Sequence, residues 1–209
     1  MPQVLKQEVR ERILAAALAA FARKSFAATP MSEIARDAGM AVANLYRYYP
    51  SKEELFAAAV PAPLAARFER LLERSVHAHA RLIGIAGPED ETAGAELLQF
   101  WIEHRLAVIV LLDRAQGSAQ EAFGERFVER LLETTLTEIR RAHPDAVVTR
   151  EARLVLRQIF ENTRRMIAVL LESCTDEAGI RRAVAAFRSY QLGGVGGFAR
   201  SLTRPDGMS

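Results

Sequence analysis

Polar side chains with hydrogen-bonding chemistry lie on one face of the segment 42–48. The 3.6-residue period of a helix places Leu45 and Tyr49 on a buried side, and Asn44 and Arg47 on the opposite, exposed side. Asn most often hydrogen bonds to adenine and Arg to guanine in the major groove of DNA, although an exposed Arg can also contact phosphate alone. The residues expected to face outward on this short helix are Val42, Ala43, Asn44, Arg47 and Tyr48.

A second set of residues suits phosphate binding. Ser51 is placed to cap a helix that begins at Lys52, and a helix N-terminus attracts phosphate through its free backbone N–H groups. Thr29 is expected to cap an earlier helix, with Pro30 in the first turn. The alternative for Lys52 is a solvated lysine in a capped helix. We predict phosphate contacts from the backbone N–H groups of residues 51–52 and from the side chains of Thr29, Tyr46, Tyr48 and Lys52.

Two short helices joined by a glycine turn are needed to present these residues. Met31, Ile34, Ala35 and Ala38 share one helical stripe, as in a helix packed on one side. Gly39 follows, and glycine adopts the positive φ of a tight chain reversal at little cost. This order predicts a helix-turn-helix motif whose second helix enters the major groove.

These spacings resemble the N-terminal DNA-binding domain of the TetR/AcrR-type transcriptional repressors. The matching residues are Thr29, Met31, Ile34, Ala35, Ala38, Gly39, Leu45, Tyr46, Tyr48, Ser51, Lys52, Glu53 and Leu55. The sequence departs from the family pattern at Ser25, where the family usually has Gly, and at Pro30, Met40, Ala41, Ala43 and Tyr49. Many fixed spacings make this a more specific match than a short motif.

The resemblance implies a sequence-specific repressor that binds double-stranded DNA as a homodimer at a near-palindromic operator. It also implies that a small-molecule effector binds the C-terminal domain and releases the operator. One alternative is a helical ligand-binding protein or enzyme that keeps a vestigial DNA-binding head, and this would lack specific operator binding. A further alternative is an activator or nucleoid-associated protein, which would raise transcription or show little sequence selectivity.

Composition limits the other classes of function. The 209 residues carry 28 Lys and Arg against 26 Asp and Glu, so the net charge is +2. Residues 1–60 hold eight basic and six acidic residues, which leaves 20 of each in the remainder. Cys174 is the only cysteine, so no intrachain disulfide forms and a cytoplasmic location is expected. The longest uncharged run, Leu55–Ala66, is too short to span a membrane. We find no catalytic, cofactor or metal motif and predict a protein that is not an enzyme and needs no cofactor.

The hydrophobic pattern predicts an all-α fold of about nine helices. Strand patterns are scarce, and Ala, Leu, Arg and Glu, which favour helices, dominate the sequence. Pro61 and Pro63 indicate a domain junction, with a three-helix DNA-binding domain in residues 1–60 and a ligand-binding and dimerisation domain in residues 61–209. The longer helices are expected at about 6–24, 63–83, 91–115, 120–142, 149–174 and 176–201.

Large aromatic residues and isolated charges in the second domain suit a ligand cavity between helices. The alternative is an ordinary aromatic core with charged side chains that extend to the surface. The expected ligand-binding residues are Trp101, His104, Arg105, Phe123, Phe127, Phe160 and Arg164. The last two helices have wide apolar faces, and similar proteins form a four-helix bundle from this pair in two subunits. We therefore expect dimerisation through residues 149–200, although internal packing alone would give the same pattern.

Overall fold

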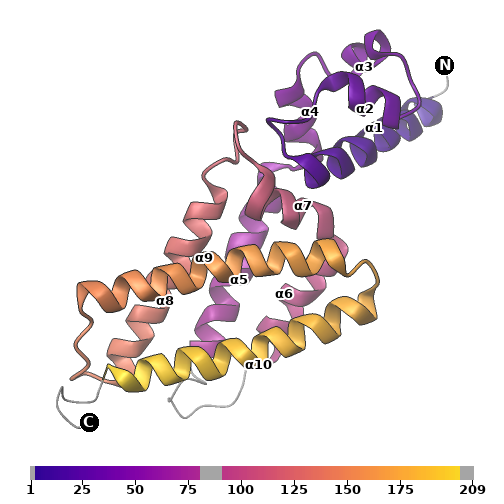
Figure 1. Ribbon diagram of the computed structural model, residues 1–209. Coiled ribbons are helices and arrows are strands. Elements are labelled where there is room, and N and C mark those ends of the chain that lie inside the picture. Colours follow the sequence, from indigo (N-terminus) through magenta and orange to yellow (C-terminus); the bar gives the residue numbers. More distant parts are fainter. Residues whose placement is uncertain (1–2, 81–90, 203–209) are drawn as a thin grey trace. The chain divides into compact units, whose positions relative to one another are not determined.

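The computed structural model describes residues 3–80 and 91–202. Within these ranges the chain forms ten α-helices, one π-helical turn and no strand, so the predicted all-α fold is confirmed. The elements are α1 (Gln3–Lys24), α2 (Met31–Asp37), α3 (Val42–Tyr48), α4 (Lys52–Ala59), α5 (Ala62–Ala80), α6 (Glu91–Glu103), α7 (Arg105–Ile109), the π-helical turn η2 (Val110–Arg114), α8 (Phe123–Ala142), α9 (Arg150–Ser173) and α10 (Glu177–Ser201) (Figure 1).

The chain divides into two compact units that each contain separate stretches of sequence. Unit 1 comprises residues 3–67 and 104–124, and unit 2 comprises the described residues of 68–103 and 125–202. Helices α7 and η2 therefore pack with the N-terminal helices, although they follow α6 in the sequence. The functional division at residue 60 stays a prediction.

Unit 1 has an aromatic core beneath the predicted helix-turn-helix. Phe21 of α1, Phe26 of the following loop and Phe56 of α4 lie with their ring centroids 5.0–5.6 Å apart. Such edge and tilted contacts stabilise aromatic clusters beyond the burial of their area. Helix α1 contacts α2, α4, α7 and η2, so it is the central element of this unit.

The single helix predicted over residues 91–115 is interrupted, and this is a correction. His104 leaves the helical region of backbone conformation, with φ −116° and ψ 30°, and separates α6 from α7. The buried apolar run that follows, from Ala107 to Leu112, packs within unit 1, whereas α6 belongs to unit 2. The chain ends this run in the π-helical turn, a local widening that is often found at functional sites.

Unit 2 is a bundle of α6, α8, α9, α10 and the part of α5 from Phe68 onward. Phe68 packs against Phe100, Trp101 and Phe127, with centroid distances of 5.5, 6.5 and 6.1 Å. Helices α9 and α10 form an antiparallel pair in Figure 1. Their starts are capped by side chains, because Thr149 accepts a hydrogen bond from the Ala152 N–H (3.1 Å) and Asp176 from the Gly179 N–H (2.8 Å).

Candidate nucleic-acid interface and ligand cavity

Helix α3 presents a mostly exposed face, as the sequence predicted. Leu45 is fully buried, whereas Asn44 and Arg47 are exposed and Tyr46 is 46% exposed. Tyr48 and Tyr49 are both half-buried, and burial raises the pKa of the Tyr49 hydroxyl. An exposed α-helix of this width fits the major groove, where Asn and Arg are the side chains that best distinguish bases.

The glycine turn that positions α3 has the predicted conformation. Gly39 has φ +66°, and its N–H donates to the Arg36 carbonyl (3.0 Å). The Met40 N–H donates to the Ala35 carbonyl (2.9 Å), which satisfies a second carbonyl at the end of α2. Helix α3 then begins after Ala41, whose side chain offers no capping hydrogen bond. This departure from the family pattern leaves the first N–H groups of α3 without a side-chain cap.

The predicted roles of Thr29 are wrong in the structure. Its side chain is completely buried, and its hydroxyl donates to the carbonyls of Ser25 (2.6 Å) and Ala20 (3.3 Å). It does not cap α2, where Pro30 occupies the N-cap position without a side-chain hydrogen bond. The Thr29 side chain therefore closes the loop between α1 and α2 and has no exposed atom to offer a phosphate.

Lys52 is a contact between α4 and the same loop. Its ammonium donates to the carbonyls of Phe26 (2.9 Å) and Thr29 (3.3 Å) and lies 4.4 Å from the centre of the Phe26 ring. Ser51 caps α4 as predicted, because its hydroxyl accepts from the Glu54 N–H (3.1 Å). A phosphate contact by Lys52 stays a prediction, and it would compete with these contacts for the same ammonium protons.

An ion-pair network fixes α2 against α1. Glu33 is buried and accepts hydrogen bonds from Lys24 and Arg23, each at 2.7 Å, and Arg23 also reaches Asp37 (3.0 Å). The hydrogen bonds from Lys24 and Arg23 hold the pKa of Glu33 below its ordinary value, and those from Arg36 and Arg23 do the same for Asp37. The two carboxylates in turn raise the pKa of Arg23. The network sets the angle between the two helices and so the placement of the turn that carries α3.

A cavity of about 560 Å³ lies within unit 2, between α5, α6, α8, α9 and α10. This volume is in the range of pockets that hold small organic molecules. Three predicted ligand-binding residues, Trp101, Phe127 and Phe160, contribute to its wall. The positions of these three side chains are thus consistent with the prediction that they line a ligand cavity.

The other predicted ligand-binding residues, His104, Arg105, Phe123 and Arg164, do not line this cavity, and their roles stay predictions. His104, Arg105 and Phe123 belong to unit 1, because residues 104–124 pack with the N-terminal helices. Arg164 of α9 is directed to an ion pair with Glu161 (3.1 Å). The polar residues that do line the cavity were not predicted: Ser75, Thr135, Thr163, Arg181, Arg188, Ser189 and Gln191.

Large apolar side chains remain exposed on α9 and α10. Val169 is 52% exposed and Tyr190 is 75% exposed, which is unusual for residues of this type within a packed bundle. Leu170 and Val184, by contrast, are half-buried, and Val184 lines the cavity. The exposed apolar residues of the two helices are Leu154, Val155, Met166, Val169 and Tyr190.

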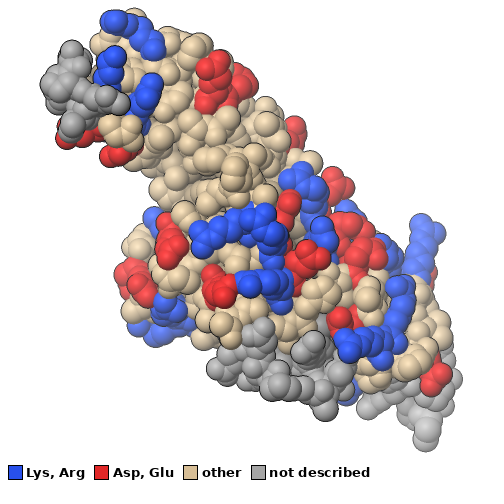
Figure 2. Space-filling view, turned by 180° about the vertical axis from the view of Figure 1, so that it is seen from behind, with Lys and Arg blue, Asp and Glu red and all other residues tan. Residues whose placement is uncertain are grey.

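Charged side chains of both signs lie on the surface. On the face drawn in Figure 2, basic and acidic side chains are interspersed. This mixture agrees with the small net charge of +2. No helix in the described ranges is long and apolar enough to cross a membrane.

The geometry of α2, the turn and α3 is that of a helix-turn-helix motif, and the same segment is similar to known regulatory proteins. Residues 13–59 match the family described as bacterial regulatory proteins, tetR family. The HTH-type transcriptional repressor KstR of Rhodococcus jostii (strain RHA1) is 42% identical over 69 residues, which cover 33% of this chain and 31% of that repressor. Residues 13–59 are therefore similar to the DNA-binding segment of the TetR family of transcriptional regulators, and the likeness to the repressor is confined to about a third of each chain.

One solved structure is similar in fold over most of the chain. A TetR-like transcriptional regulator from Rhodococcus sp. RHA1 is similar over 95% of this chain and 96% of its own, with 22% identity and a TM-score of 0.50. A TetR-family transcriptional regulator from Streptomyces coelicolor has 20% identity over 96% of this chain and 92% of its own, with a TM-score of 0.36. At these identities the likeness concerns the arrangement of helices alone.

Proposed function

We propose that this protein is a homodimeric transcriptional repressor that recognises a near-palindromic operator through α3. The observation that carries the proposal is the exposed pair Asn44 and Arg47 on a helix positioned by the Gly39 turn, inside a segment that matches the TetR family. A relative with 42% identity over 69 residues is named a transcriptional repressor. Repression, rather than activation, is therefore the form of regulation that we propose.

The exposed apolar faces of α9 and α10 support a dimer. Burying Val169, Tyr190 and their neighbours against a second copy would remove apolar surface from water at roughly 25 cal/mol per Å². A two-fold dimer presents two copies of α3 to successive major grooves, which matches a near-palindromic site. Dimerisation and DNA recognition are thus linked in the proposal.

Release by a small molecule is supported by the cavity and by the course of the chain. Trp101 of α6 lines the cavity, and a single residue, His104, separates α6 from α7, which packs on α1 in unit 1. At the end of η2, the Arg114 carbonyl accepts a hydrogen bond (2.8 Å) from the N–H of Phe26. An effector that binds one position of α6 better than another would release DNA only through this difference in affinity.

Selection of bound sequences from random DNA by the purified protein tests the proposal. We expect one enriched near-palindromic sequence. Asn44→Ala and Arg47→Ala should each lower the discrimination between this sequence and its single-base variants by about 1–3 kcal/mol, at one or two base pairs of each half-site. The exposed Arg182 of α10 provides a control, since Arg182→Ala should leave the selected sequence unchanged. A parallel loss for all operator variants would make the two residues backbone contacts, and no enrichment would favour a ligand-binding protein or enzyme with a vestigial head.

A further inference from the structure

The cavity of unit 2 has an unbalanced set of charges in its wall. Among the residues that the structure describes, two arginines, Arg181 and Arg188, line it, and no Asp or Glu does. Most of the remaining wall is apolar, with Leu, Val, Phe and Ile side chains from five helices. A cationic group beside an apolar cavity is costly unless an anion accompanies it, because burial removes water from the charge.

Two polar side chains in this wall, those of Arg181 and Thr163, already have hydrogen-bond partners within the protein. Arg181 donates to Gln99 and to Glu177 just outside the cavity, each at 2.8 Å. Thr163 of α9 accepts a hydrogen bond from the Gln191 side chain of α10 and donates to the Ile159 carbonyl (2.9 Å). These groups hold α6, α9 and α10 together and have little capacity left for a ligand.

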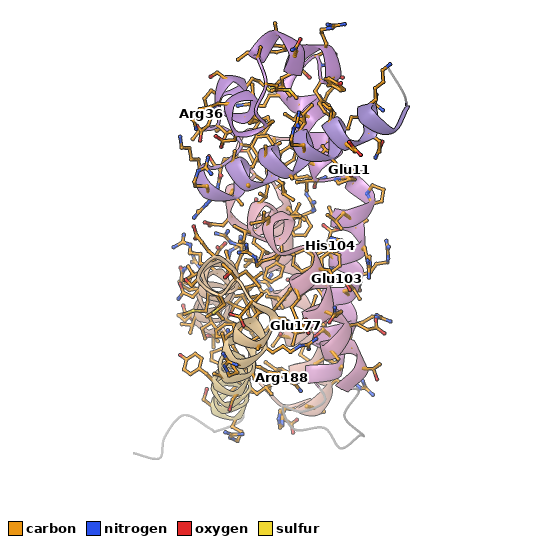
Figure 3. The ribbon with its side chains drawn as sticks, turned by 90° about the vertical axis from the view of Figure 1, so that its right-hand side faces the viewer. Glu11, Arg36, Glu103, His104, Glu177 and Arg188 are labelled. Carbon is orange, nitrogen blue, oxygen red and sulfur yellow. The ribbon has the colours of Figure 1, made fainter. Side chains whose placement is uncertain are left out.

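Arg188 differs from them. It lies on α10 (Figure 3), it is half-buried, and it makes no ion pair or hydrogen bond with the described residues. The residues one turn away on α10, Val184, Ala185, Gln191 and Leu192, include no carboxylate that could pair with it. Its guanidinium can therefore give two parallel hydrogen bonds to two oxygens of one anionic group.

Trp101 provides a second, independent group. Its side chain is only 7% exposed, its ring packs on the edge of Phe68, and its indole Nε1 has no hydrogen-bond acceptor among the described residues. Most buried indole N–H groups do have an acceptor, since leaving one unpaired costs about 1–3 kcal/mol. An oxygen of a bound molecule would satisfy this donor.

We propose that the cavity binds an amphiphilic organic anion, whose carboxylate, sulfonate or phosphate pairs with Arg188 and whose apolar body fills the space along Phe127 and Phe160. An additional oxygen of the molecule accepts from Trp101 Nε1. This inference rests on the proposed effector site and names its ligand class. It separates the roles of the two arginines, with Arg181 structural and Arg188 ligand-binding.

Two naphthalene dyes that differ by one anionic group test the role of Arg188. The sulfonate dye 1-anilinonaphthalene-8-sulfonate and its neutral counterpart N-phenyl-1-naphthylamine are titrated into the full-length protein, and their fluorescence is followed together with that of Trp101, the only tryptophan. We expect Arg188→Gln to lower the affinity for the sulfonate dye roughly 10-fold or more and the affinity for the neutral dye less than about 2-fold. Arg188→Lys, which keeps the charge, should retain most of the affinity.

The matched control is Arg182→Gln, an identical change at an exposed position of α10 outside the cavity, which should alter neither dye. For Trp101→Phe, we expect the affinity for 2-acetylnaphthalene, which has a carbonyl oxygen, to fall roughly 5-fold. The affinity for 2-ethylnaphthalene, which has none, should not fall; both are measured by displacement of the neutral dye. The proposal is overturned if wild-type protein binds neither dye, or if Arg188→Gln weakens both dyes alike or leaves the sulfonate dye unaffected. An equal loss of the two naphthalenes overturns the Trp101 contact. Because no DNA is present, these results do not depend on whether an operator is found.

Discussion

Replacing Lys52 by methionine tests whether this residue holds the DNA-binding unit together. Its ammonium joins α4 to the loop before α2 through the carbonyls of Phe26 and Thr29 and through the Phe26 ring. Methionine keeps an unbranched apolar side chain that can cover the same surface, so Lys52→Met removes mainly the charge and its hydrogen bonds. A loss of stability would then measure these contacts.

The contacts give the expected size of the effect. A hydrogen bond from a charged donor contributes roughly 1.5–3 kcal/mol, and a partly exposed cation–π contact adds about 0.5–1 kcal/mol. Lys52 is half-buried, so water can hydrate the two carbonyls in the variant and offset part of this loss of free energy. We expect Lys52→Met to lower the free energy of unfolding by about 2 kcal/mol, which for a chain of this length is a melting temperature lower by about 4–8 °C.

Urea denaturation followed by circular dichroism measures the loss, with Lys6→Met as the control. Lys6 is exposed on α1, and the same substitution there should change the free energy of unfolding by less than about 0.5 kcal/mol. DNA binding over a series of salt concentrations separates the second role, since one lost phosphate contact lowers the salt slope by about one. Unchanged stability together with a lower salt slope would refute the structural role and make Lys52 a phosphate contact.

Three further predictions concern the loop, the ion-pair network and the dimer. Ser25 has φ +130°, a backbone conformation that favours glycine. Both Ser25→Gly and Ser25→Ala lose the hydrogen bond from the Ala28 N–H, but only glycine relieves the backbone strain, so Ser25→Gly should be more stable than Ser25→Ala by about 1 kcal/mol. Equal melting temperatures of the two variants would contradict this. Since hydrogen bonds from Lys24 and Arg23 lower the pKa of Glu33 in the folded state, its stabilisation is present above the ordinary value of 4.5 and is lost as pH falls through the lowered pKa. Glu33→Gln should therefore destabilise near neutral pH and converge with wild type in thermal denaturation only when the pH falls below that lowered pKa; a constant difference would count against the network. Val169→Glu should give folded monomers in sedimentation at micromolar concentration, whereas Val147→Glu, in the loop before α9, should remain dimeric, and a monomeric wild type would rule out the dimer.

Local features of the DNA-binding unit could be predicted from the sequence because short-range rules decide them. The positive φ of Gly39, the cap at Ser51 and the burial of Leu45 each depend on residues within one helical turn. Helix boundaries in α9 and α10 were also close to prediction, since their starts carry capping residues. The match to a known pattern added the functional meaning of that geometry.

Thr29 and Lys52 make contacts that short-range rules do not predict. Both residue types suit a cap or a phosphate contact, yet the carbonyls to which they donate include those of Ala20 and Phe26, nine and 26 positions earlier in the chain. Ser25 is a related example: the TetR/AcrR pattern usually has glycine at this position, and the positive φ of Ser25 is a conformation that glycine adopts more easily. A loop with carbonyls turned inward needs donors, and these two side chains supply them.

The cavity shows the same limit at longer range. Aromatic residues on helical faces predicted Trp101, Phe127 and Phe160, but a periodic pattern does not distinguish a filled core from one that leaves space. The distinction depends on which polar groups remain unpaired after folding. Arg164 and Arg188 are alike in the sequence, each an arginine on a long amphipathic helix, yet the first has Glu161 three residues before it and the second has no carboxylate within a turn. That difference, and not aromatic content, makes the Arg188 wall of unit 2 suitable for an anionic ligand.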